Sequence, residues 1–133
     1  MDKVKIAFIA LGTIIAQGLG GWDMTLGTLV AFVIIDYVTG VMAAICRKEI
    51  SSKIGYQGLM KKLSIFIAVY MVCLLGNLLG IETARYAIIV GFIINEGFSI
   101  LENFNNMKFR YPKVLDELFK ILKKKVGGDD EYN

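Results

Sequence analysis

The stretch LVAFVIIDYVTGVMAAI, from Leu29 to Ile45, decides the fold class of this chain. It would supply most of a membrane-spanning helix, which needs about 20 predominantly apolar residues, yet it carries the carboxylate of Asp36 near its middle. A second run, IVGFIINEGFSIL from Ile89 to Leu101, places Glu96 in a nearly identical setting. Because an ionisable side chain inside a spanning helix is costly, both acids need a structural or functional reason.

The composition indicates an integral membrane protein. Of the 133 residues, 56% are hydrophobic, whereas soluble domains usually have about 45–50%, and the mean hydropathy is +0.59. The charged residues gather between four apolar segments, whereas a soluble domain spreads them along every surface helix. We therefore expect an all-α membrane domain over residues 1–104, with four transmembrane helices at about residues 4–21, 24–46, 63–80 and 84–103.

An internal repeat suggests how these helices pair. VAFVIIDYVT from Val30 aligns with VGFIINEGFS from Val90, and at the same offset Gln17 aligns with Asn77. We interpret this as two helical hairpins related as parallel repeats. The alternative is three transmembrane helices, with the first segment on the membrane surface. That segment also has features of a cleaved signal peptide, but the short link GWDM that follows it favours a hairpin.

The basic residues predict the orientation. The chain has 15 lysines and arginines, and in the four-helix arrangement all except Arg85 lie on one side of the membrane. Because loops rich in lysine and arginine remain in the cytoplasm, we expect the N- and C-termini to be cytoplasmic.

Small residues recur at or near four-residue spacing along the predicted helices. In lipid, such residues let helix backbones approach closely. They serve either to fold the monomer alone or also to join copies into a homo-oligomer, and the pattern leaves both open. The helix-packing candidates are Gly12, Ala16, Gly20, Gly27, Ala31, Gly40, Gly76 and Gly80.

Polar residues accompany the two acids, in part at helical spacing, so that Asp36 and Thr39 share one face, as do Glu96, Ser99 and Asn103. These groups are either neutral, hydrogen-bonded packing groups or the lining of a pore. The intramembrane polar and pore-lining candidates are Asp36, Thr39, Asn95, Glu96, Ser99 and Asn103.

The residues needed for catalysis are scarce. The chain has no histidine, and its two cysteines lie on different segments. We find no metal-ligand cluster and no phosphate-binding glycine loop outside the membrane segments. We therefore expect no enzyme, no catalytic residue, no cofactor, no metal and no nucleic-acid partner.

Residues 105–126 predict a cytoplasmic linker and a basic amphipathic helix. KVLDELFKILKKKV, which follows Pro112, separates an apolar stripe from a charged face. Such a helix can lie on an anionic inner leaflet, and the alternative is packing against a partner subunit. Residues 127–133 form an acidic tail that we expect to be disordered. The predicted membrane-surface lysines are Lys113, Lys120, Lys123, Lys124 and Lys125.

The ordered set DYVTG (36–40), SSKIGYQGLMKK (51–62), INEGFSILEN (94–103) and Pro112 before a basic helix resembles the toxin-secretion/phage-lysis holin family. The resemblance covers the chain from about Leu29 to Leu122. The matching positions are Asp36, Gly40, Ser52, Gly55, Gly58, Lys62, Asn95, Glu96, Ser99, Glu102 and Asn103. Members of this family are often described with three spans.

The resemblance implies a small multi-pass protein of the bacterial cytoplasmic (inner) membrane that assembles into non-selective lesions. A cell-wall lytic enzyme (endolysin) or a large toxin would leave through them as passing cargo, which causes or permits host lysis. The alternative function is a small cation- or proton-coupled transporter or channel that uses Asp36 and Glu96.

Overall fold

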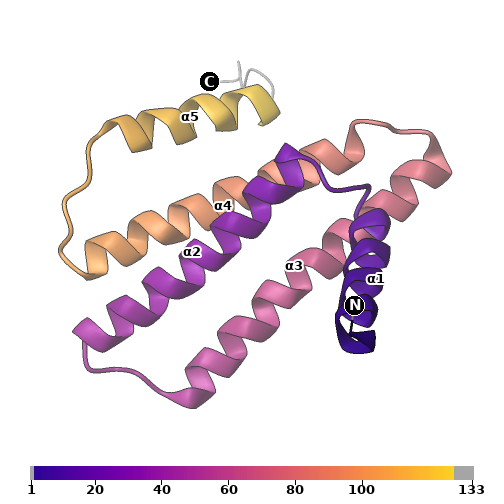
Figure 1. The fold of residues 1–133 in the computed structure, drawn as a ribbon. Helices are drawn as coiled ribbons and strands as arrows, with labels where there is room; N and C mark the ends of the chain where they lie inside the picture. The colour runs from indigo at the N-terminus through magenta and orange to yellow at the C-terminus, as the bar shows by residue number, and fades with distance from the viewer. Residues whose placement is uncertain (1, 128–133) are drawn as a thin grey trace.

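A computed structural model describes residues 2–127, and within this range the chain forms five α-helices and no strand (Figure 1). The predicted acidic tail lies outside the described residues except for Gly127, which ends the last helix. The prediction of an all-α chain is confirmed. The helices are α1 (Lys3–Gly18), α2 (Met24–Cys46), α3 (Ser52–Leu79), α4 (Ala84–Asn106) and α5 (Val114–Gly127).

Three of these helices are long and apolar enough to cross a membrane. They are α2 with 23 residues, α3 with 28 and α4 with 23. At a rise of about 1.5 Å per residue, each is at least about 34 Å long, which exceeds the roughly 30 Å thickness of the hydrocarbon core. Their outer faces carry exposed apolar side chains, such as Ile34, Ile67 and Leu74. Such surfaces suit contact with lipid.

The predicted fourth transmembrane helix is not supported. The first segment forms a helix of 16 residues that ends at Gly18, or about 24 Å of helix, too short for the hydrocarbon core. The chain then turns through Gly20 and Gly21, which both have positive φ angles. The alternative of three spanning helices fits the structure.

The first predicted hairpin is also not formed, because α1 lies against α3 rather than along α2 (Figure 1). A Cβ atom on Gly18 would meet the ring of Tyr70 on α3. Among the described helices, the extensive contacts join α2 to α4, α3 to α4, α4 to α5 and α2 to α3. Helix α4 is thus the centre of the fold.

The apolar core lies between α2, α3 and α4. Each helix contributes residues at helical spacing, so one stripe of every span is buried. Its buried members are Leu26, Leu29, Val33, Ile65, Val69, Cys73, Ile89 and Ile93, together with Leu19 from the linker between α1 and α2.

Arg85, at the start of α4, holds the linker between α1 and α2 in place by hydrogen bonds. Its guanidinium donates hydrogen bonds to the carbonyl oxygens of Leu19 at 2.6 Å and Gly21 at 2.9 Å, and to the Asp23 carboxylate at 2.8 and 3.2 Å. Asp23 also caps α2 by accepting from the Leu26 N–H at 2.9 Å. One side chain therefore orders the whole turn.

These hydrogen bonds of Arg85, here called the Arg85 clamp, predict that the order of the linker between α1 and α2 depends on pH. Hydrogen bonds from Arg85 and then from the Leu26 N–H hold the pKa of Asp23 below its usual range. The stabilisation is therefore complete at neutral pH and is lost as the pH falls through the lowered pKa. A spin label at Trp22→Cys should become more mobile in Arg85→Gln and, in the otherwise unchanged chain, at about pH 2. Arg47→Gln, an exposed control, should leave its mobility unchanged. Equal mobility in all variants would contradict the clamp.

Candidate functional site

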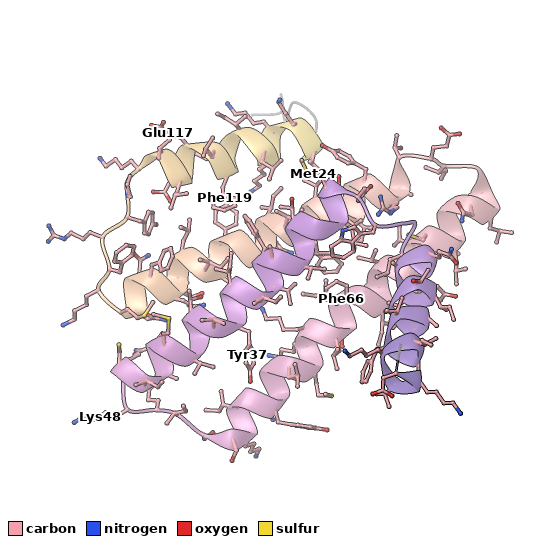
Figure 2. The ribbon with its side chains drawn as sticks, in the orientation of Figure 1. Met24, Tyr37, Lys48, Phe66, Glu117 and Phe119 are labelled. Atoms are coloured by element: carbon pink, nitrogen blue, oxygen red, sulfur yellow. The ribbon has the colours of Figure 1, made fainter. Side chains whose placement is uncertain are left out.

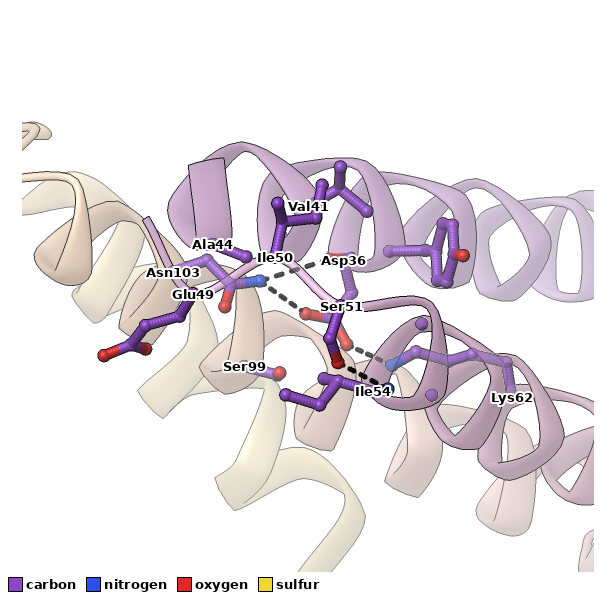
Figure 3. Close-up of a pocket in the computed structure, with 14 residues that line it drawn as sticks. Asp36, Val41, Ala44, Glu49, Ile50, Ser51, Ile54, Lys62, Ser99 and Asn103 are labelled. Atoms are coloured by element: carbon purple, nitrogen blue, oxygen red, sulfur yellow. Dashed lines mark hydrogen bonds and ion pairs between the residues drawn. The ribbon is translucent and has the colours of Figure 1, made fainter. Parts of the chain in front are cut away.

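Two acids and a lysine meet between the three spanning helices. Figure 3 shows the lysine, Lys62, and one of the acids, Asp36. The Lys62 ammonium on α3 donates to the Asp36 carboxylate on α2 and, at 2.6 Å, to Oε2 of Glu96 on α4. Asp36 is 5% exposed and Glu96 is 7% exposed, while 17% of the Lys62 side chain is accessible. Because each charge comes from a different helix, this ion network joins α2, α3 and α4.

Asn103 extends the network along α4 and α2. Its Nδ2 lies 2.8 Å from Oδ1 of Asp36 and 2.9 Å from Oγ1 of Thr39, and both oxygens accept hydrogen bonds from it. The Thr39 hydroxyl in turn donates to the carbonyl oxygen of Ile35 at 2.8 Å. Within residues 2–127, every buried polar side-chain atom has a hydrogen-bond partner. The monomer therefore satisfies its buried polar atoms internally.

Helical register explains how these side chains meet. Asp36 and Thr39 lie one turn apart on the face of α2 that packs on α4. Glu96 and Asn103 lie two turns apart on the face of α4 that packs on α2. Asn103 also lies beside Gly40, where an added Cβ would be in ordinary van der Waals contact with its Nδ2, at 3.6 Å.

The charges are mutually dependent. Asp36 and Glu96 would repel each other in a medium of low dielectric constant, and the Lys62 ammonium between them offsets this repulsion. Lys62 alone at this depth would be as unfavourable as either acid alone. Removing one partner of a buried ion pair is strongly destabilising because it leaves an uncompensated charge.

The structure brings four of the six predicted polar residues, Asp36, Thr39, Glu96 and Asn103, into one network. Ser99 lines an open recess of about 240 Å³ beside the network (Figure 3). Asn95 is exposed and lines a different recess, next to α5.

Sequence reasoning named Lys62 only as a family-matching position and counted it among the cytoplasmic basic residues, so it missed the pairing of Lys62 with the two acids. The signal was present in the register of α3, because Lys62 is three residues before buried Ile65 and seven before buried Val69. This spacing puts Lys62 on the buried face of the helix. Its neighbour Lys61 is exposed, and the pair KK at the edge of an apolar run resembles a loop.

The predicted packing residues have several different roles. Gly76 is buried, and a Cβ there would lie 3.1 Å from the Ile81 carbonyl oxygen and 3.2 Å from the Ala84 Cβ. Gly80 ends α3 with a φ of +70°, and Gly20 lies beneath Arg85 with a φ of +90°.

The remaining packing candidates lie away from the tightest contacts. Gly27 is half-buried beside the Trp22 ring, and Ala16 is half-buried on α1. Gly12 and Ala31 are exposed, and a Cβ at Gly12 would meet nothing within 4 Å.

Helix α5 packs on the bundle within the same chain (Figure 2). The Phe119 ring lies against the rings of Phe32 on α2 and Phe98 on α4, with centroids 6.0 and 5.9 Å away. The predicted membrane-surface lysines are exposed: Lys113, Lys120, Lys123, Lys124 and Lys125.

Three apolar helices joined by an internal ion network define a small helical membrane protein. The chain belongs to the bacteriophage holin family, whose family model matches residues 13–124. The family resemblance predicted from the sequence motifs is confirmed. Proteins of this family are non-enzymatic membrane proteins, as predicted.

Individual relatives support this membership. The chain is 36% identical over 129 residues to an uncharacterized protein of Listeria monocytogenes, which covers 96% of this chain and 92% of that protein. It is 36% identical over 124 residues to an uncharacterized protein of Clostridium perfringens, with 92% of each chain covered. It is 27% identical over 103 residues to a probable holin of Bacillus phage phi105, covering 74% of this chain and 76% of that protein. No solved structure matches the chain.

The ion network predicts a specific stability pattern. Lys62→Met leaves two buried carboxylates without a counter-charge, so the free energy of unfolding should fall by about 3–5 kcal/mol. Asp36→Asn should lower it less, because the Lys62–Glu96 pair remains. The measurement is unfolding of the purified full chain by sodium dodecyl sulfate in mixed micelles, followed by circular dichroism.

The matched control is Lys61→Met on the exposed side of the same helix, where a change within about 0.5 kcal/mol is expected. Equal unfolding free energies for Lys62→Met and Lys61→Met would show that the network contributes nothing to the fold.

Proposed function

We propose that this protein acts as a holin that accumulates in the bacterial cytoplasmic membrane and then assembles with copies of itself into non-selective lesions. A cell-wall lytic enzyme, or a large toxin, leaves the cell through them as passing cargo. Family membership supports the holin role. The observation that carries the proposed mechanism is the ion network of Lys62, Asp36 and Glu96, which is buried within the monomer.

The network is consistent with two successive states of the protein, a separate monomer and an assembly of several copies. In the separate monomer, the paired charges face one another and not the lipid, so copies can collect without opening the membrane. In an assembly, the same polar stripes could turn toward a shared aqueous space, where water replaces the internal partners. The stripes comprise Asp36, Thr39, Glu96, Ser99 and Asn103. A small exposed residue on a spanning helix, such as Ala31 on α2, offers a surface for close helix association between copies.

The transporter alternative gains no support from this geometry. A cation relayed by both acids would have to lie between Asp36 and Glu96, and the Lys62 ammonium already occupies that position. Among the described residues, no group of three or more acids, cysteines or histidines could hold a metal ion.

The three spans change the proposed orientation. The α2–α3 link and the segment after α4 lie on one side of the membrane and carry Arg47, Lys48 and the lysines of α5. We assign this side to the cytoplasm on the basis of its positive charge. An odd number of spans then places α1 and the N-terminus outside, opposite to the orientation expected with four spans.

Cysteine labelling of intact cells before lysis tests this topology. In a chain without Cys46 and Cys73, Lys5→Cys and Thr83→Cys should react with a membrane-impermeant maleimide, whereas Ser52→Cys should react only after permeabilisation. Protection of Lys5→Cys together with labelling of Thr83→Cys would mean that α1 crosses the membrane, and it would contradict three spans.

Lysis timing tests the function itself. Asp36→Asn keeps an acceptor for Asn103 and leaves the Lys62–Glu96 pair, so it should retain much of the lytic activity. Asp36→Leu should insert more readily but lyse late or never, because its polar group is lost. Glu96→Gln and Glu96→Leu should differ in the same way. The measurement is the onset of membrane depolarisation and culture lysis at equal membrane abundance, with a co-expressed lytic enzyme.

A transporter would behave differently in this assay. It needs the titratable carboxyl group, so Asn and Gln should be nearly as damaging as Leu, and the flux should be slow and ion-specific. Normal lysis by both Leu variants would refute a pore-lining role for the two acids.

A further inference from the structure

Helix α5 contacts α2 and α4 mainly through the aromatic ring of Phe119. Phe119 packs on Phe32 and Phe98, and it covers Gly97, where an added Cβ would overlap the ring. Leu122 packs against the apolar core. A glycine on α4 thus leaves room for a ring from α5, and the amphipathic helix packs part of its apolar stripe, including half-buried Phe119 and Leu122, against its own chain. Other apolar residues of α5, such as Leu118, stay exposed.

The docked position brings lysines to an unfavourable depth. Lys123 lines the same recess as Gly91 and Asn95 on α4. Asn95 lies about 16 Å from the end of α4, at 1.5 Å per residue, and half the hydrocarbon thickness is about 15 Å. Docked α5 therefore holds Lys123 near the middle of any bilayer that α4 spans, with Lys120 and Lys124 exposed beside it.

In lipid, the docked position of α5 is therefore unfavourable when α4 spans the bilayer. Ammonium groups at mid-bilayer depth are strongly disfavoured, whereas the same lysines are attracted to anionic headgroups at the membrane surface. The link between α4 and α5 covers residues 107–113, which can extend to about 23 Å. This reach lets α5 move from the side of α4 to the surface without unfolding α4.

We propose that α5 is a detachable cover with two alternative positions. One is the docked position around Gly97, and the other is an anionic lipid surface, to which α5 transfers when α4 spans a bilayer. After transfer, the apolar rings of Phe32 and Phe98 face hydrocarbon, which tolerates them. The inference rests on α4 spanning the membrane, as the proposed function requires, but it does not depend on lesion formation.

Spin labels at Ala87→Cys and Gly127→Cys report the docked position, because both residues line the recess between α4 and α5. The full chain, without its native cysteines, is measured in neutral detergent micelles and in vesicles of phosphatidylcholine with or without phosphatidylglycerol. The labels should be close together in micelles. They should separate in vesicles, and phosphatidylglycerol should increase the separated fraction. Lys124→Gln should lower the ratio of separated to docked chains about fivefold, the equivalent of about 1 kcal/mol per lysine.

Two glycines on α4 provide a matched pair. Gly97→Ala adds a methyl group beneath the Phe119 ring and should raise the separated fraction in micelles. Gly91→Ala adds the same group where nothing lies within 4 Å, and it should have no effect. Equal effects of the two substitutions would refute the proposed packing of the Phe119 ring over Gly97.

External labelling of Thr83→Cys, together with protection of Asn106→Cys at the other end of α4, shows in the same vesicles whether α4 spans. Labels that stay together in phosphatidylglycerol vesicles while Thr83→Cys is accessible and Asn106→Cys is protected would overturn the detachable cover and leave the proposed function intact. Equal separation with and without phosphatidylglycerol would overturn the assignment to an anionic surface. Failure of α4 to span would overturn both the proposed function and the cover.

Discussion

The structure depends on the compensation of buried charge in a medium that cannot solvate it. Asp36, Lys62 and Glu96 are individually unfavourable within the membrane, and together they satisfy one another. Since hydrophobic burial does not draw helices together in lipid, this network supplies a directional reason for α2, α3 and α4 to pack in one arrangement. The apolar stripes around it give close contact, while the charges select which faces meet.

The spanning helices could be predicted from sequence because the bilayer imposes both their length and their apolar composition. The two acids could be found because a carboxylate in an apolar run is anomalous. Lys62 was harder to find, since it adjoins exposed Lys61 at the edge of a run. Its role becomes visible only when the register of α3 is followed through Ile65 and Val69.

The errors concern features set by contacts distant in sequence. The first segment is apolar enough to suggest a span, but α1 ends at Gly18, and the turn after it is ordered by Arg85 from the start of α4. No local sequence pattern indicates that Arg85 contacts this turn. Likewise, the pattern of α5 predicts an amphipathic helix but not the surface that covers its apolar stripe, which depends on the space above Gly97.

The stoichiometry of the ion network has a collective consequence. With all three groups ionised, two carboxylates share one ammonium, so each copy contains one surplus negative charge. In a dry assembly, the surplus charges of neighbouring copies would repel one another through a medium of low dielectric constant. Water and mobile cations screen such charges over about 8–10 Å at physiological salt. In the proposed assembly, crowding of copies would therefore penalise a dry cluster and favour one that admits water, so that hydration and assembly would be thermodynamically coupled.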